Sequence, residues 1–172
     1  MKAADPAGAP GSAAPERRII QRGLYFEEFE ENAVYVHSPG RTVSEADNIL
    51  FSTLTMNTQS LHLDAEWAKR TEFGERLINS MLTLSALVGT SVAQLTQGTV
   101  VANLGFTEVK FPNPMRAGDT MRSETRLLSK RLSRSRAGQG VVELEHIARN
   151  QRDEILVVAT RTTLVLCSPI HP

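Results

Sequence analysis

The segment LTMNTQSLHLDAEWA, residues 54–68, holds the side chains whose types are best suited to chemistry. His62 lies among small polar residues just before a predicted helix, and histidine is the side chain whose charge changes most readily near neutral pH. Asn57 precedes it by five residues, and an amide there can orient a water molecule but cannot remove its proton. Taken alone, such a histidine is more often structural or exposed than catalytic, and such an asparagine more often forms a side-chain turn.

Three predicted helices must position this segment. Apolar spacing and a preceding serine that can cap the first turn predict one helix over 45–55. Asp64 fits the N-cap of a short second helix over 64–71 better than a catalytic role, so His62 is expected in the loop before it. A longer helix is predicted over 76–95, where so little polar face remains that we expect it to be buried.

The remainder of the chain favours strands. One short strand is expected at 33–37, followed by a turn at 38–40, which reads Ser-Pro-Gly. Four further strands are predicted from alternating or β-branched runs over 99–112, 119–134, 140–150 and 154–167. Helices followed by hairpin-linked strands predict an α+β domain with an antiparallel sheet, which must curve around the apolar helix.

The composition limits the functions open to this chain. Its 172 residues suit one domain, predicted over 18–172, after an Ala-, Pro- and Gly-rich tail over 1–17 that we expect to be disordered. Nineteen basic and nineteen acidic side chains cancel, which removes the electrostatic argument for nucleic acid or an anionic membrane. A single cysteine without clustered Cys/His spacing predicts no metal site and a cytoplasmic protein, and no apolar run is long enough to span a membrane.

Several separate motifs resemble one family. Across 42–166 the sequence is similar to the MaoC-type hot-dog-fold hydratases, the R-specific enoyl-CoA hydratase group, in the segments TVSEADNILF, NTQSLHLDAEWAKRTEFGERLINSM, VKFPNPMRAGDT and SKRLSRSRAGQGVVELEHIARNQRDEILVVATR. The resemblance implies a hot-dog fold, in which an antiparallel sheet wraps a long central helix. It also implies homodimers or higher homo-oligomers that bind acyl-CoA thioesters at the interface between copies. No separate cofactor is expected, since CoA is part of the substrate.

The resemblance assigns candidate residues. The family's catalytic loop, Gly-Asp-x-Asn-Pro-x-His-x-Asp, places its histidine on His62, its catalytic aspartate on Asn57 and its asparagine on Gln59. A second family element, Ile-x-His-Gly-Met, falls on the start of the longest helix. There, unpaired backbone N–H groups would donate to the thioester carbonyl. It adds candidate substrate-binding residues, namely Asn79, Ser80 and Met81.

The asparagine at position 57 leaves two interpretations open. Either the site has lost a group that acid–base chemistry requires and the protein binds acyl-CoA without turnover, or His62 alone acts on water that Asn57 holds. We favour the second, because the loop remains rich in small polar side chains. A negatively charged substrate would explain the amide, since a carboxylate beside an aspartate is repelled. This points to short branched dicarboxylic acyl-CoAs of the mesaconyl, itaconyl or methylmalyl type, with Arg41 as the candidate to hold the carboxylate.

The basic run SKRLSRSRAGQG is the last candidate segment. On a continuous strand Arg134 and Arg136 would project from the same face, and a run of this kind is usually a solvated surface. The resemblance implies instead that both contact CoA phosphates. The leading function is therefore reversible hydration of an enoyl-CoA. The alternatives are a non-catalytic acyl-CoA-binding subunit and an acyl-CoA thioesterase.

Overall fold

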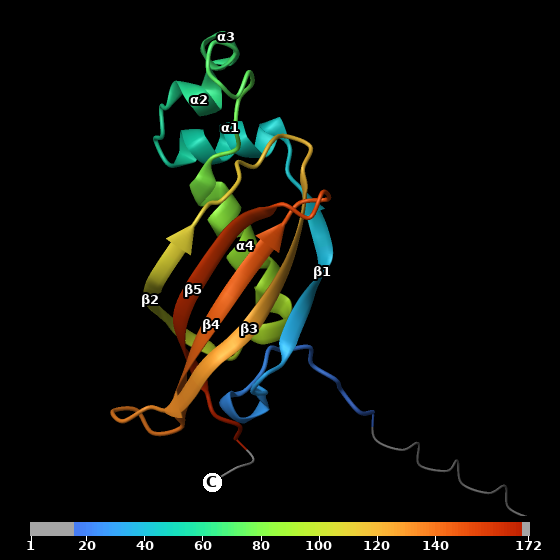
Figure 1. The fold of residues 1–172 in the computed structure, drawn as a ribbon. Helices are drawn as coiled ribbons and strands as arrows, with labels where there is room; N and C mark the ends of the chain where they lie inside the picture. Colours follow the sequence, from blue (N-terminus) through green and yellow to red (C-terminus); the bar gives the residue numbers. More distant parts are fainter. Residues whose placement is uncertain (1–15, 170–172) are drawn as a thin grey trace, which may run out of the picture.

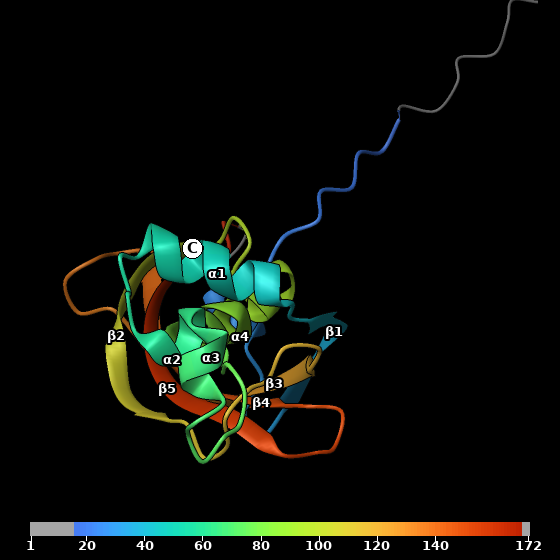
Figure 2. The same cartoon turned by 90° about the horizontal axis from the view of Figure 1, so that it is seen from above.

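A five-stranded antiparallel sheet curves around one long helix in the computed structural model, which describes residues 16–169 (Figures 1 and 2). The strand order is β1-β3-β4-β5-β2. The strands are β1 (Val34–Thr42), β2 (Val100–Lys110), β3 (Thr120–Leu132), β4 (Gln139–Arg149) and β5 (Ile155–Leu166). The α+β hot-dog arrangement is confirmed, whereas most of the predicted tail over 1–17 and the last three residues lie outside the described part of the chain.

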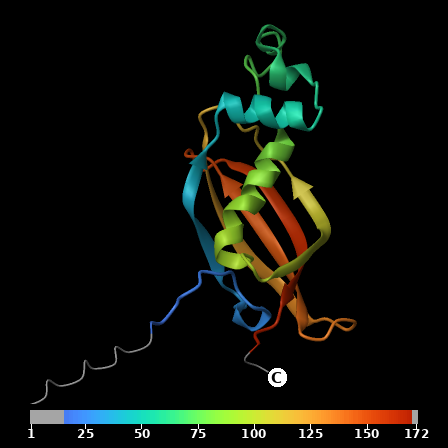
Figure 3. The same cartoon turned by 180° about the vertical axis from the view of Figure 1, so that it is seen from behind.

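The helices and one short 3-10 turn occupy the inner face and the ends of the sheet. They are η1 (Phe26–Glu28), α1 (Glu45–Leu54), α2 (Ser60–Leu63), α3 (Ala65–Ala68) and α4 (Ser80–Leu95). Seen from behind, α4 lies along the concave face and α1 crosses the end at which α4 begins (Figure 3). Together with α2 and α3, α1 covers this end of α4 (Figure 2).

Residue alternation explains how the sheet encloses α4. Along β4, every second residue is buried, including Val142, Leu144, His146 and Ala148, because successive side chains of a strand point to opposite faces. Helix α4 contributes Leu87, which is fully buried in the same hydrophobic cluster as Ala148. The inner face of the sheet is therefore the core.

Strand β1 corrects one prediction. The expected turn at Ser38-Pro39-Gly40 lies inside β1, where the pairing with β3 shifts register between His37 and Arg41. Proline has no N–H for the ladder, so it is tolerated at the edge of a sheet, which is where β1 lies. The Ser-Pro-Gly sequence, which predicts a turn, therefore forms an irregularity within an edge strand.

Helix α4 begins later than predicted and is less buried. Its first residue is Ser80 rather than one near 76, because the preceding backbone is held outside the helix: the N–H of Ile78 donates to the carbonyl of Met115 at 2.9 Å. One face lacks cover from this chain, since Met81 is 47% exposed and Ser85 is also exposed. The prediction of a buried helix is therefore confirmed for the face that the sheet encloses and wrong for this exposed face of the single chain.

His62 lies on a helix, not in the predicted loop. Helix α2 carries it for one turn, and Asp64 then begins α3 by accepting a hydrogen bond from the N–H of Trp67 at 2.9 Å. The predicted N-cap role of Asp64 is confirmed. The predicted capping serine of α1, Ser44, likewise accepts from the N–H of Asp47 at 3.2 Å.

Candidate active site

His62 opens onto a cavity of about 390 Å³ at the end of the sheet where α4 begins. The cavity is mainly apolar, with four polar side chains that come from three segments, two of them from α4. The lining residues are Leu61, His62, Phe73, Leu77, Ile78, Ser80, Thr83, Phe111, Asn113, Pro114, Met115 and Leu156. A mostly apolar cavity with a few convergent polar groups is the usual form of a small-molecule site.

One hydrogen bond determines which ring nitrogen of His62 carries the proton. Its Nδ1 lies 2.9 Å from the backbone carbonyl oxygen of Leu77. A carbonyl oxygen only accepts, so in the neutral ring Nδ1 carries the proton and Nε2 keeps its lone pair. The imidazole is partly buried and partly open. The site thus offers a nitrogen base held in one tautomer.

The start of α4 supplies the second polar group of this cavity. The N–H of Ser80 has no acceptor among the described residues, as expected of the first residue of a helix. The N–H of Met81, by contrast, donates to the side-chain oxygen of Asn79 at 2.9 Å. Asn79 is only 2% exposed, so its side chain caps the helix and does not line the cavity. His62 and Ser80 are the two sequence-predicted residues that the cavity brings together.

Asn57 lies in a turn rather than on the cavity wall. Its side-chain oxygen accepts from the N–H of Gln59 at 3.1 Å, and its own N–H donates to the carbonyl of Ser52 at 2.9 Å. Neither Asn57 nor the exposed Gln59 lines the cavity in the single chain. The side-chain turn considered for Asn57 is therefore present.

Arg41 faces a different cavity. It lines a groove of about 630 Å³ along the exposed face of α4, together with residues such as Ser85 and Gly89. Its guanidinium pairs with Asp47 at 2.6 Å. Within one chain, Arg41 and His62 are not brought to the same cavity.

Arg134 and Arg136 correct a further structural prediction. Strand β3 ends at Leu132, so both arginines lie in the β3–β4 connection and not on a strand. The N–H of Arg136 donates to the hydroxyl of Ser133 at 3.2 Å, and Gly138 has a positive φ of 70°, both of which favour a turn. This connection lies at the opposite end of the sheet from α2 (Figure 1).

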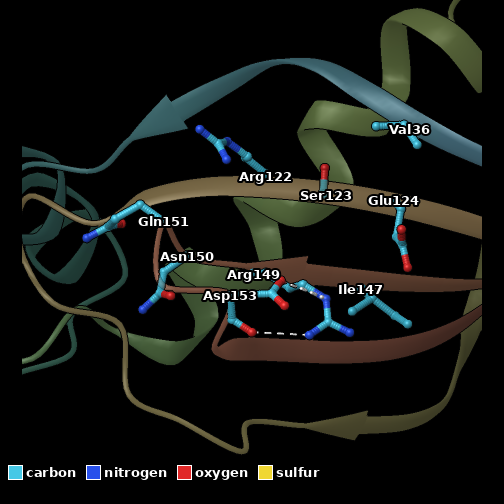
Figure 4. A pocket seen from close by; sticks show the side chains of 9 residues that line it. All are labelled: Val36, Arg122, Ser123, Glu124, Ile147, Arg149, Asn150, Gln151 and Asp153. Carbon is cyan, nitrogen blue, oxygen red and sulfur yellow. Dashed lines mark hydrogen bonds and ion pairs between the residues drawn. The ribbon is translucent and has the colours of Figure 1, made fainter.

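A further cavity lies on the outer face of the sheet and contains none of the candidate residues. Its volume is about 360 Å³, and its lining comes from β1, β3, β4 and the β4–β5 turn (Figure 4). Its charges are locally balanced, since Arg149 lies 3.7 Å from Asp153. Among residues 16–169, no group of three or more His, Cys, Asp or Glu side chains could hold a metal ion. No helix in this range is long and apolar enough to cross a membrane.

Two other histidines are buried in the core. His37 and His146 are bridged by the hydroxyl of Thr125, which lies 2.7 Å from a ring nitrogen of each. The pKa of His146 is lowered to about 3, first by burial and then by the charges of Arg161 and His37. Both histidines lie away from the His62 cavity.

Sequence reasoning missed two kinds of site residue. Phe111 and Asn113 line the cavity from the segment VKFPNPMRAGDT, which was noticed only as a family motif. Asn48 donates to the backbone carbonyls of His62 and Leu77, but its position inside a helix gave no signal in the sequence. An amide among apolar helical positions is the only local feature that could have singled it out.

The family model described as MaoC like domain matches residues 28–150. The chain belongs to this family. Among curated relatives, it is 34% identical to the (R)-specific enoyl-CoA hydratase of Rhodospirillum rubrum over 56% of this chain and 65% of that protein. It is 26% identical to the beta-methylmalyl-CoA dehydratase of Chloroflexus aurantiacus over 83% of this chain, which spans 40% of the length of that relative.

The MaoC-like fold is also seen in solved structures. One Mycobacterium tuberculosis protein, described as having a double hot-dog fold, matches with a TM-score of 0.77 at 23% identity. The match covers 87% of this chain and 46% of that one. At this identity the likeness concerns the fold alone, and it agrees with the single curved sheet around α4.

Proposed function

We propose that this MaoC-like chain catalyses the reversible addition of water to the α,β double bond of an enoyl-CoA thioester. The observation that carries the proposal is the tautomer of His62, whose Nδ1–H is bound to the Leu77 carbonyl so that Nε2 remains a base beside a mainly apolar cavity. The names of its relatives, hydratases and dehydratases of CoA thioesters, support the same reaction class.

The reaction balances with the groups available. Nε2 of His62 removes a proton from water as the water oxygen bonds to the β carbon, and the electrons of the double bond shift to the thioester oxygen. The N–H of Ser80, a residue that lines the cavity and whose N–H has no acceptor among the described residues, is our candidate donor to that oxygen. The proton then passes from His62 to the α carbon. Water is thus added as hydroxyl and hydrogen, with no other reactant.

The test uses purified protein and a panel of enoyl-CoAs. Loss of the enoyl absorbance without release of free thiol is the expected result, and His62→Gln should lower the rate at least about 100-fold. The variant Asn150→Asp changes a buried residue of the β4–β5 turn and should keep the wild-type rate. Release of free thiol would identify a thioesterase and refute the proposal.

The acyl group that we propose is short, branched and dicarboxylic. It is supported by the names of relatives that match more than four fifths of this chain, beta-methylmalyl-CoA dehydratase at 83% and mesaconyl-CoA hydratase at 83%. The cavity lining of one chain has no charged side chain, so a cation must reach the distal carboxylate from elsewhere. Arg41 is our candidate, which requires it to exchange Asp47 for the substrate.

Two substitutions test this charge argument. The charge argument requires position 57 to face the substrate in the complete site, although it does not line the cavity of one chain. In Asn57→Asp, the added carboxylate should then repel a dicarboxylic substrate, so kcat/KM should fall on mesaconyl-CoA and stay the same or rise on crotonyl-CoA. In Arg41→Gln, only the dicarboxylic substrate should lose affinity. If Asn57→Asp raised the activity on crotonyl-CoA and left dicarboxylic substrates unaffected, the charge argument would fail.

A second copy of the chain completes our proposal. Strand β2 is an edge strand with exposed apolar side chains, among which Leu104 is 54% exposed, and such an edge favours pairing with another strand. The β3–β4 connection, which carries both Arg134 and Arg136, lies at the opposite end of the sheet from α2, so we propose that the two arginines contact CoA phosphates at the site of the other copy. Arg134→Gln with Arg136→Gln should raise KM and leave kcat unchanged. A dimer mass in light scattering is the accompanying expectation.

One observation favours a second candidate, a subunit that binds acyl-CoA without turnover. Asn57 replaces the acid of the family motif, and its oxygen is already engaged by the N–H of Gln59. Tight binding of an enoyl-CoA in calorimetry, with unchanged absorbance over the whole panel, would establish this alternative.

A further inference from the structure

Asn48 is hydrogen-bonded to both segments that carry the polar groups of the proposed reaction, the imidazole of His62 and the N–H of Ser80. It lies on α1, is 3% exposed, and uses all of its side-chain polar atoms inside the protein. Its Nδ2 donates to the carbonyls of His62 at 3.2 Å and of Leu77 at 3.1 Å, and its Oδ1 accepts from the N–H of Asn79 at 2.8 Å. One side chain therefore ties α1 to the His62 turn and to the start of α4.

The orientation of this amide is unambiguous. The N–H of Asn79 can only donate, so the atom that faces it must be the oxygen, and the NH2 group must face the two carbonyls. All three hydrogen-bond partners of Asn48 are backbone groups, and its side chain is closed to solvent. Water therefore does not compete for these hydrogen bonds.

The same carbonyl serves both Asn48 and the imidazole. The oxygen of Leu77 accepts from Nδ1 of His62 at 2.9 Å and from Nδ2 of Asn48 at 3.1 Å, which uses both of its lone pairs. Asn48 thereby fixes the position of the acceptor that selects the tautomer of His62. Through Asn79 it also fixes the residue just before Ser80.

We infer that Asn48 is the positioning residue of this site, which sets the tautomer of His62 and its distance from the N–H group of Ser80. This inference rests on the proposed hydration for its kinetic consequence but not for its structural one. Hydrogen-bond partners that orient metal-binding histidines typically contribute 10- to 100-fold in activity, and we expect an effect of the same size for a residue that orients this imidazole.

The decisive variant is Asn48→Asp. It has nearly the same shape and keeps the acceptor for Asn79, but it loses both donors and places a negative charge beside the carbonyls of His62 and Leu77. We expect kcat to fall about 10- to 100-fold with KM within about threefold of wild type. Asn48→Ser keeps one donor and should give an intermediate loss of kcat, which guards against misfolding of the first variant.

Two measurements separate positioning from general destabilisation. Nitrogen-15 NMR of labelled histidine, assigned through His62→Gln, should show the Nδ1–H tautomer in the wild type and a mixture in Asn48→Asp. The control Asn150→Asp loses a donor at an equally buried amide whose Nδ2 lies 2.6 Å from Glu154. It should lower the unfolding temperature while kcat and the tautomer stay unchanged.

The outcomes are distinct for the two proposals. An unchanged His62 tautomer and a kcat within threefold of wild type in Asn48→Asp would overturn the inference. Absence of hydration in the wild type together with a changed tautomer in Asn48→Asp would refute the proposed function and uphold the role of Asn48.

Discussion

The buried histidine His146 predicts a loss of stability in mild acid. Its side chain is fully buried, and its pKa in the folded state is about 3, first because of burial and then because of the charges of Arg161 and His37. In the unfolded chain the pKa of a histidine is about 6.5. Between these values the unfolded state binds more protons, so the free energy of unfolding falls as the pH falls below about 6.5.

The size of the effect follows from the difference between pH and the unfolded pKa. At pH 5 that difference is about 1.5 units, which corresponds to about 2 kcal/mol of lost stability from His146. His37, whose pKa burial also lowers, adds to the same trend. Urea unfolding at pH 5, 6 and 7 measures this loss of stability. Most carboxylates titrate below this pH range.

A variant isolates the contribution of His146. His146→Gln cannot titrate, so its loss of stability between pH 7 and 5 should be smaller than that of wild type by about 2 kcal/mol. The control Ile147→Val, at the next residue of β4, should lower the stability equally at each pH. A wild-type pH slope in His146→Gln would refute the assignment of the effect to this buried ring.

Three further predictions concern the scaffold, each measured by urea unfolding. Leu87→Ala removes a fully buried side chain of α4 and should cost about 2–5 kcal/mol; a loss below 1 kcal/mol would contradict the packing of α4. Asp119→Ala should lower the free energy of unfolding by about 1–3 kcal/mol, because the N–H of Arg116 loses its acceptor, a buried carboxylate oxygen 3.0 Å away; a neutral effect would contradict that contact. In Gly23→Ala, the new Cβ would lie 2.4 Å from the backbone nitrogen of Thr96, so stability should fall by about 1–3 kcal/mol; an unchanged stability would show that this segment is not packed as described.

Features set by local chemistry were predictable. Asp64 caps its helix as expected, because an N-cap needs only a side-chain oxygen and the next turn of backbone. The strands of the curved sheet followed from alternation, which depends on the period of a strand alone. Arg134 and Arg136 were misplaced on a strand, because a basic run carries no information on where pairing stops.

By itself, the sequence determined the order of elements, the family and the histidine most suited to chemistry. These depend on spacing along the chain, which is fixed before folding. Only the tertiary structure decided that His62 shares a cavity with Ser80, that Asn57 turns away from its wall, and that Asn48 holds the site together. Contacts of this kind join residues that are distant in sequence, and hydrogen bonds to backbone leave no pattern in the side chains of their partners.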